Sequence, residues 1–494
     1  MEISITPAQM RALEEQYMKE TGMPGALLME HAAQGIIAAI SRSTKGQRAL
    51  FLCGPGNNGG DGYAAARLWA ACGNESTVLE LTDAVRGDAA LNRLLALQSG
   101  VTLLAADGVS VLPACDVIVD ALFGTGLSRA ADGTAARLIR LVNASGVPVI
   151  AVDIPSGLDG TTGLPLGPAI RAAETVTFHR PKQGLLMTPA APFVGRLTVQ
   201  PILIPAGYGQ QEGLRCLRPE DLPAVIPPRP IDAHKGTFGR VVIIAGSPGM
   251  AGAAAFAARA AIRTGAGLTT LVCRASILPI LQVLVPGATC TVLPEADGRL
   301  LPEAKEIAAG ALAGASAAVV GCGIGQTDDW LPVLCAAKVA ACPVIWDADA
   351  LNLLAAHPAL LPLKAADTVT PHPGEAARLL GCSTVDVTRD PLAAIDALYR
   401  RTGCHVLLKG ARTLMTDGDH TAVNRFGTPA MAKGGSGDIL SGILAALTAR
   451  LSPSLLALQA AALLHAQAAL RAEEASGEDG LEPEAFIRGI RISR

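Results

Sequence analysis

The chain has 494 residues, of which half are hydrophobic and only 3% aromatic, and its formal net charge is −3. This length exceeds one ordinary hydrophobic core, so at least two domains are expected, and the Ala-, Val-, Leu- and Gly-rich composition favours an α/β protein. The chain has no basic stripe or Lys/Arg run, which argues against nucleic-acid binding.

The cysteines and the apolar segments bear on the compartment. Eleven cysteines occur singly, without a CxxC pair, which indicates neither a disulfide framework nor a zinc cluster and favours a reducing cytoplasm. The N-terminal stretch lacks the apolar core of a signal peptide. Residues 455–470 are too few to span a bilayer and carry His465, so we expect a buried helix there and no membrane segment.

The first half opens with a helix-period pattern over residues 24–40 and then a short apolar strand over residues 49–53. We predict that the glycine-rich stretch GPGNNGGDG, residues 54–62, is a loop that precedes the next helix. Strand, glycine-rich loop and helix is the arrangement by which α/β proteins bind nucleotides. The oxygens of Asn57, Asn58 and Asp61 could hold a ligand hydroxyl or a hard cation. The alternative is an Asn/Gly turn in which Asp61 caps the helix.

Two further strands are predicted to end at the same edge of a parallel sheet. DVIVD ends at Asp120 and leads to Gly124, Thr125 and Gly126, and VPVIAVD ends at Asp153. Ligands of open α/β sheets bind at the carboxyl ends of the strands, so three such ends favour a site over unrelated turns. Strands over residues 174–186 and 196–205 complete this layer, and the Pro- and Gly-rich residues 205–230 predict a linker.

The second half repeats the α/β pattern. Residues 234–267 predict a strand, a loop and an Ala-rich helix, and further strand-like segments cover residues 317–325, 342–354, 367–381 and 405–415. His372 lies between two prolines at a strand end, where it is either functional or structural. Lys409 follows an apolar strand, so it is either a nucleotide phosphate ligand or a solvated strand end.

The stretch GTPAMAKGGSGDILSGILAALTA, residues 427–449, predicts an anion site. Its glycines let consecutive N–H groups converge, and a helix begins there whose N-terminus favours phosphate. Asp438 stands at the start of that helix, where it could accept a proton from a hydroxyl that attacks the phosphate. The alternative is that Asp438 only caps the helix.

The ordered set of motifs resembles the family of bifunctional NAD(P)H-hydrate repair enzymes. NNGGDG, VDALFGTGL, DIPSGLDG and PKQGLL occur in the first half, and HKGTFGRVVIIAGS, VGCGIG, DADALNLL, TPHPGEAARLL, LLKGART and GGSGDILSG occur in the second. The resemblance implies a Rossmann-like epimerase domain over residues 1–213 and a ribokinase-like, ADP-dependent dehydratase domain over residues 214–494. His31 stands where many relatives have Asn.

The resemblance also implies the residues of each site. In the first domain the hydrated nucleotide would contact Asn57, Asn58, Gly59, Gly60, Asp61, Gly124, Thr125, Gly126, Leu127, Ser128, Arg129 and Asp153. A potassium ion would be held by Asn58, Asp120 and Ser156. In the second domain the hydrate would contact Ala253, Gly323, His372 and Asp438, and the adenine nucleotide would contact Lys409, Gly410, Ala411, Arg412, Thr413 and Gly437.

The implied activity is repair of the hydrated nucleotides NADHX and NADPHX. One domain would interconvert their R and S forms, and the other would dehydrate the S form with ADP, releasing AMP and phosphate, with Mg²⁺ expected from the phosphate chemistry. We expect Asp438 and Asp153 to be the acid/base residues and the enzyme to be a cytoplasmic homo-oligomer. The alternatives are a ribokinase-type small-molecule kinase, which Asp438 fits equally well, and a first half that only binds a nucleotide or partner and regulates the second.

Overall fold

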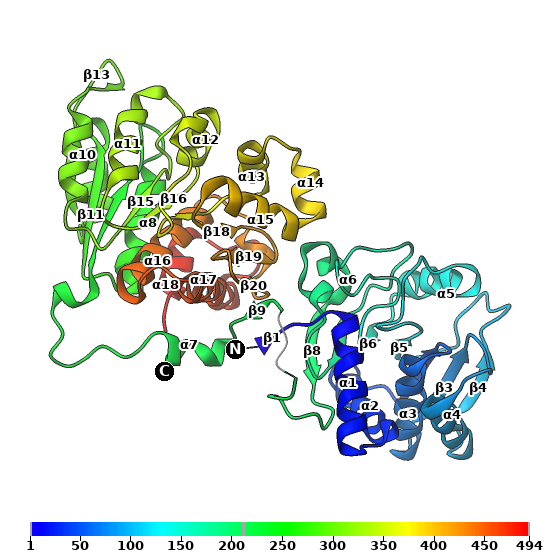
Figure 1. Ribbon diagram of the computed structural model, residues 1–494. Helices are drawn as coiled ribbons and strands as arrows, with labels where there is room; N and C mark the ends of the chain where they lie inside the picture. The colour runs from blue at the N-terminus through cyan, green and yellow to red at the C-terminus, as the bar shows by residue number, and fades with distance from the viewer. Residues whose placement is uncertain (1, 210–212, 493–494) are drawn as a thin grey trace. The chain divides into compact units, whose positions relative to one another are not determined.

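The computed structural model describes residues 2–209 and 213–492, which form two compact units (Figure 1). One unit contains Ile3–Leu214, and the other contains Arg215 onward together with Glu2. The prediction of a continuous linker over residues 205–230 is wrong in part. Strand β9 (Arg215–Cys216) pairs with a neighbour in the second sheet, and a short helix, α7 (Leu222–Val225), follows it.

The first unit alternates strands and helices, as the sequence predicts. Its elements are α1 (Pro7–Thr21), α2 (Gly25–Ser43), β2 (Arg48–Cys53), α3 (Asn57–Ala71), β3 (Glu75–Glu80), α4 (Gly87–Gln98), β4 (Thr102–Ala105), β5 (Val117–Ala121), α5 (Gly133–Ala144), β6 (Val149–Val152), β7 (Glu174–Phe178), α6 (Ala191–Val194) and β8 (Arg196–Gln200). The strands form one parallel sheet in the order β4-β3-β2-β5-β6-β7-β8.

Both faces of this sheet are covered. Along β2, Phe51 packs into the cluster that contains α2 and α3, whereas Leu50 and Leu52 pack into the cluster that contains α5. This alternation is what a strand between two helical layers requires. The chain runs outward from β2 to β4 and then returns to β5 on the other side of β2, so the sheet has its topological switch point between β2 and β5. Ligands of open α/β sheets bind at such a point.

The second unit is larger and has a mixed sheet. Its helices and main strands are β10 (Arg240–Ile244), α8 (Ala251–Thr264), β11 (Leu268–Arg274), α9 (Leu278–Leu284), β12 (Thr289–Leu293), α10 (Ala304–Leu312), β15 (Ala317–Val320), α11 (Leu331–Val339), β16 (Val344–Trp346), α12 (Asp349–Ala356), β17 (Thr368–Val369), α13 (Pro373–Leu380), α14 (Thr384–Arg389), α15 (Pro391–Thr402), β18 (His405–Leu408), β19 (Thr413–Thr416), β20 (Thr421–Asn424), α16 (Ser436–Leu451), α17 (Leu455–Ser476) and α18 (Pro483–Gly489). A separate two-stranded sheet consists of β13 (Glu295–Ala296) and β14 (Arg299–Leu300).

The large sheet has the order β1-β9-β20-β19-β18-β17-β16-β15-β10-β11-β12, in which β1 is Glu2–Ile3. Strands β10 to β12 and β15 to β18 are parallel, and β19 and β20 continue the sheet as antiparallel strands. The switch point lies between β10 and β15, and the loops that follow these two strands meet there.

Helices α8, α16 and α17 form the core of this unit together with the sheet. Gly442 of α16 lies so close to α8 that a Cβ atom there would be 2.1 Å from the carbonyl oxygen of Ala257. Helix α17 is long and apolar enough to cross a membrane, but 78% of its apolar window is buried inside the protein. It is therefore a core helix, as the sequence predicts.

Candidate active sites

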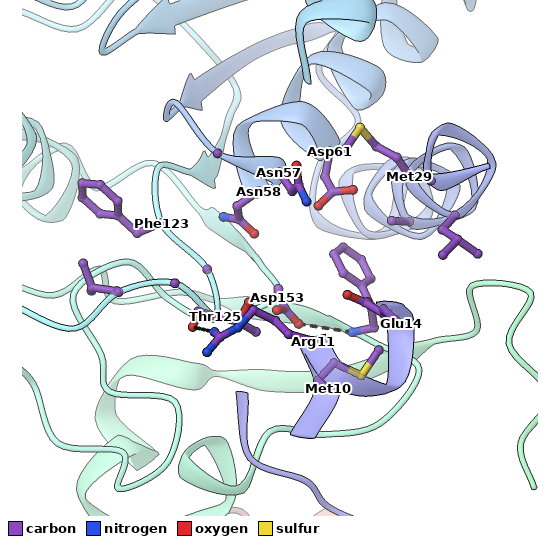
Figure 2. Close-up of a pocket in the computed structure, with 18 of the residues that line it drawn as sticks. Met10, Arg11, Glu14, Met29, Asn57, Asn58, Asp61, Phe123, Thr125 and Asp153 are labelled. Atoms are coloured by element: carbon purple, nitrogen blue, oxygen red, sulfur yellow. Dashed lines mark hydrogen bonds between the residues drawn. The ribbon is translucent and has the colours of Figure 1, made fainter. Parts of the chain in front are cut away.

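The first unit has a cavity of about 530 Å³ at the carboxyl ends of its central strands. Figure 2 shows side chains from α1, from the start of α3 and from the loops after β5 and β6 pointing toward this space. Of the predicted site residues, the ones that line it are Asn57, Asn58, Asp61, Gly124, Thr125, Gly126, Leu127, Ser128, Arg129 and Asp153. The cavity lies at the switch point between β2 and β5, so the fold itself places a ligand site there.

The glycine-rich stretch after β2 is mostly helical, which corrects the prediction of a loop over residues 54–62. Helix α3 begins at Asn57, and Gly56 precedes it as the N-cap. Gly59 is buried in the first turn, where a Cβ atom would be 2.0 Å from the carbonyl oxygen of Gly54. Gly60 is buried against Met29. These two glycines therefore allow the close approach of neighbouring segments, while the flanking side chains face the cavity.

Asp61 lies in the second turn of α3, so it does not cap the helix. Its side chain is buried at the edge of the cavity. Burial, followed by the charges of Asp153 and Glu14, raises the pKa of Asp61 well above its usual value, and Lys182 partly offsets this. Its surroundings therefore disfavour the charged form of Asp61.

The side chain of Asp153 lines the cavity and is held in place by two hydrogen bonds. Its φ of 63° is unusual for a residue with a side chain, and its Oδ1 atom accepts hydrogen bonds from Lys182 Nζ at 2.5 Å and Thr177 Oγ1 at 2.9 Å. The side chain of Lys182 is only 1% exposed, so the two residues form a buried ion pair. Lys182 lies in the predicted motif PKQGLL, but the sequence does not show that it reaches Asp153.

Helix α1 supplies two charged cavity residues that the sequence analysis missed, Arg11 and Glu14. A side-chain nitrogen of Arg11 donates to the carbonyl oxygen of Thr125 and so fixes the loop after β5 (Figure 2). Burial raises the pKa of Glu14 to about 7, Asp153 adds to the increase, and Lys182 and Arg11 oppose it. In the sequence, the charged residues of α1 indicate a solvent-exposed face. Only the packing of this helix shows that Arg11 and Glu14 line the cavity.

Asp120 and Ser156 lie next to the cavity rather than in its lining. Asp120 is fully buried, and its carboxylate accepts hydrogen bonds from Ser156 Oγ at 2.6 Å and Ser156 N at 2.8 Å. Burial raises the pKa of Asp120 to about 6. Asn58 lies against Gly124, and its buried Nδ2 atom has no hydrogen-bond partner in the described structure. A carboxylate, a hydroxyl and an amide oxygen are suitable donors for a hard cation.

In the second unit, the predicted anion site lies at the start of α16. Gly435 is the N-cap with φ 92°, and Asp438 is in the first turn. Burial raises the pKa of Asp438 to about 6, and the charge of Asp347 adds to the increase. The buried His465, which the sequence analysis treated only as part of a core helix, donates through Nε2 to the carbonyl oxygen of Ser436 at 2.9 Å. His465 therefore supports the turn that presents the N–H groups.

An ion pair beside this turn was missed by the sequence analysis. Asp347 follows β16, is 1% exposed, and accepts hydrogen bonds from Lys409 Nζ at 2.8 Å and Ser441 Oγ at 2.6 Å. Glu375 lies 3.8 Å from the same nitrogen. A Cβ atom on Gly437 would be 3.5 Å from Lys409 Nζ, so the ammonium group lies at the predicted anion site.

The residues expected to contact the hydrate come from several strand ends. A Cβ atom on Gly323, which has φ 64°, would lie 2.9 Å from Cβ of Ala253, so these two positions are adjacent at the switch point between β10 and β15. His372 is the N-cap of α13, and its Nδ1 atom accepts a hydrogen bond from Gly374 N at 3.0 Å. Its Nε2 atom lies 3.4 Å from Glu375, which links it to the Lys409 cluster.

The segment expected to bind the adenine nucleotide is the turn between β18 and β19. Gly410 and Ala411 are exposed, and Thr413 Oγ1 donates to the carbonyl oxygen of Gly410 at 3.2 Å. Arg412 donates to the carbonyl oxygen of Arg425. The structure thus brings Lys409 into the Asp347 cluster and directs Arg412 toward the end of β20.

Both units match known protein families. Residues 25–184 match the model described as YjeF-related protein N-terminus, and residues 241–491 match the model described as NAD(P)H-hydrate dehydratase. The structure is similar to a ribokinase-like superfamily protein from Enterococcus faecalis, with a TM-score of 0.50 and 26% identity over 57% of this chain and 95% of that one. The second unit is therefore a ribokinase-like domain, which follows a Rossmann-like parallel-sheet domain.

Full-length relatives specify the family. The chain is 36% identical to the bifunctional NAD(P)H-hydrate repair enzyme of Coxiella burnetii over 98% of both chains. It is 37% identical to the enzyme of that name from Moorella thermoacetica, over 90% of this chain and 87% of the relative. The protein belongs to the family of bifunctional NAD(P)H-hydrate repair enzymes, as its motifs predict.

Proposed function

We propose that this chain repairs hydrated NADH and NADPH. The first unit interconverts the R and S forms of NADHX and NADPHX, and the second unit dehydrates the S form with ADP, releasing AMP and phosphate. The main structural support is that each unit has its own group of acidic side chains: Asp153 lines the cavity of the first unit, and Asp438 lies in the first turn of α16 near Asp347. Two separate sites suit two reactions on one substrate.

The dehydration becomes favourable when the hydroxyl on ring carbon C6 is turned into a better leaving group. In this proposal Asp438 accepts the hydroxyl proton, the oxygen attacks the terminal phosphorus of ADP, and AMP leaves. The ring nitrogen lone pair then expels phosphate, and loss of a proton from C5 restores the double bond. The backbone N–H groups of Gly435 to Gly437 and the ammonium group of Lys409 stabilise the charge on the transferring phosphoryl group.

Asp438 suits this role because its pKa is raised to about 6. At neutral pH it is mostly ionised and yet basic enough to take a proton in the transition state. Ala253, Gly323 and His372 would contact the hydrate. Residues 409–413 and Gly437 would contact ADP, which would bring Mg²⁺ on its phosphates.

In the first unit, Asp153 is the proposed acid/base residue, and the loops after β2 and β5 hold the nucleotide. Asn58, Asp120 and Ser156 would hold K⁺, which would supply positive charge beside the buried carboxylate. We also propose a cytoplasmic homo-oligomer. Light scattering coupled to size-exclusion chromatography would measure its assembly.

The test uses purified full-length protein and a mixture of the two NADHX epimers, with and without ADP. Regenerated NADH is followed by absorbance and released phosphate by a colorimetric assay. Conversion of both epimers, dependent on ADP and matched by phosphate, is expected. Conversion of one epimer only would remove the epimerase function. A stable phosphoester without NADH would instead identify a small-molecule kinase.

A further inference from the structure

Four acidic residues line the cavity of the first unit, Glu14, Asp61, Asp88 and Asp153. Asp153 lies on the side formed by β6 and β7, and Glu14 approaches from α1 (Figure 2). Lys182 Nζ donates a hydrogen bond to Asp153 Oδ1 at 2.5 Å, whereas within the described residues the Glu14 carboxyl group has no cation at hydrogen-bond distance. Asp153 is thus paired with a cation, whereas Glu14 lines the same cavity without such a pair.

The surroundings of Glu14 disfavour its charge. It is partly buried by the packing of α1, and the charged groups that act on it come from α1 itself, from α3 and from the segments after β6 and β7. These groups are Arg11, Glu15, Asp61, Asp153 and Lys182. Burial is the largest effect and raises the pKa of Glu14 to about 7. A carboxyl group of this kind holds a proton for part of the time at neutral pH and can donate it.

We propose that Glu14 is the general acid of the epimerase and that it works together with Asp153 as the general base. This inference rests on the proposed function, because it assigns a residue to the epimerisation. Both side chains line one cavity, so a nicotinamide ring bound in that cavity can contact both of them. When the surroundings give two neighbouring carboxyl groups different pKa values, one group can act as the acid and the other as the base.

The reaction needs no oxidant or reductant. Carbon C6 carries both the hydroxyl group and the ring nitrogen N1, so it is a hemiaminal. Asp153 takes the hydroxyl proton, the O–H electron pair forms the C=O bond of an aldehyde, and the C6–N1 bond breaks with its electron pair on N1. Glu14 gives its proton to N1. The aldehyde then rotates about the C5–C6 bond, and N1 attacks its other face while both protons return.

The test compares Glu14→Gln with Glu15→Gln in the full-length protein. Glu15 is the next residue of α1, and it is exposed, so its substitution removes a charge from the same helix without touching the cavity. Each protein is mixed with both NADHX epimers, excess ADP, Mg²⁺ and K⁺. The S form is consumed directly by the second unit, and the R form reports the epimerase. Each variant is checked for folding by circular dichroism and thermal unfolding.

In Glu14→Gln we expect conversion of the R form to fall about 100-fold or more, while the rate for the S form stays unchanged. Glu15→Gln should match the wild type, and Glu14→Asp should restore part of the rate. The wild-type rate for the R form should fall as the pH rises through about 7, because the acid form of Glu14 is lost. Glu14→Gln should lack this decline, which a merely structural role would not explain.

Folded Glu14→Gln that converts the R form within threefold of the wild-type rate would overturn the assignment and leave the proposed function standing. A wild-type protein that converts only the S form would instead remove the epimerase itself. The two failures are therefore distinguishable in one experiment.

Discussion

Substitution of Asp153 by Asn should destabilise the first unit strongly, because it leaves the ammonium group of Lys182 buried without its carboxylate partner. Lys182 is only 1% exposed, and its remaining hydrogen bonds go to the neutral acceptors Thr177 Oγ1 at 3.2 Å and the Phe178 carbonyl oxygen at 3.1 Å. Removal of one partner of a buried ion pair costs about 3–5 kcal/mol. For a unit of roughly 200 residues, this corresponds to a melting temperature lower by about 6–20 °C.

The assay is calorimetry of the full-length protein, with each transition assigned to a unit by hydrogen-exchange mass spectrometry. Asp107→Asn is the matched control, because the side chain of Asp107 is 93% exposed and lies 4.0 Å from Arg137. This exposed pair should contribute less than about 1 kcal/mol. The double variant Asp153→Asn/Lys182→Met should recover part of the lost stability, since it removes both charges.

A loss below about 1 kcal/mol in Asp153→Asn, with the double variant no more stable than the single one, would refute this reasoning. The result also affects how activity is interpreted. A loss of epimerase activity in Asp153→Asn is evidence for a catalytic role only at temperatures at which the first unit of the variant remains folded.

Four further outcomes concern both sites. Asp438→Asn should lower the turnover of the S form by about 100-fold or more without a large change in KM, as steady-state kinetics would show; normal turnover would exclude Asp438 as the base. The wild-type kcat/KM for dehydration should fall as the pH drops through about 6. The reason is that the pKa of Asp438 is raised to about 6 and only its ionised form accepts a proton. A kcat/KM that stays constant from about pH 5 to 7 would contradict this prediction. Gly323→Ala should destabilise the second unit by about 1–3 kcal/mol, measured by urea unfolding. The φ of Gly323 is 64°, and the new Cβ atom would lie 2.9 Å from Cβ of Ala253. A variant as stable as the wild type would show that the loop adjusts freely. Replacement of K⁺ by a large organic cation should slow conversion of the R form and leave that of the S form unchanged, whereas equal effects on both would argue against a K⁺ site near Asp120.

The alternation of apolar strands with helix-period segments was enough to predict the α/β architecture. The strand ends at Cys53, Asp120 and Asp153 also placed one edge of the first sheet correctly, because parallel strands with such connections present their carboxyl ends together. The start of α3 was predicted six residues too late, at residue 63 instead of Asn57. Glycines usually disfavour a helix, which is why a loop was predicted. Gly59 and Gly60 nevertheless lie within α3, at positions where the neighbouring segments leave no room for a side chain.

The sequence by itself determined the fold class, the glycine-rich turn before α16 and the family, since these depend on local periodicity and on motifs that are contiguous in the chain. Only the tertiary structure decided which charges meet. Glu14 joins the cavity through the packing of α1, Lys182 reaches Asp153 from 29 positions away, and Asp347 pairs with Lys409 from 62 positions away. The free energy of a buried charge depends on its distance from other charges and on its exposure, and neither is set by neighbours in the sequence.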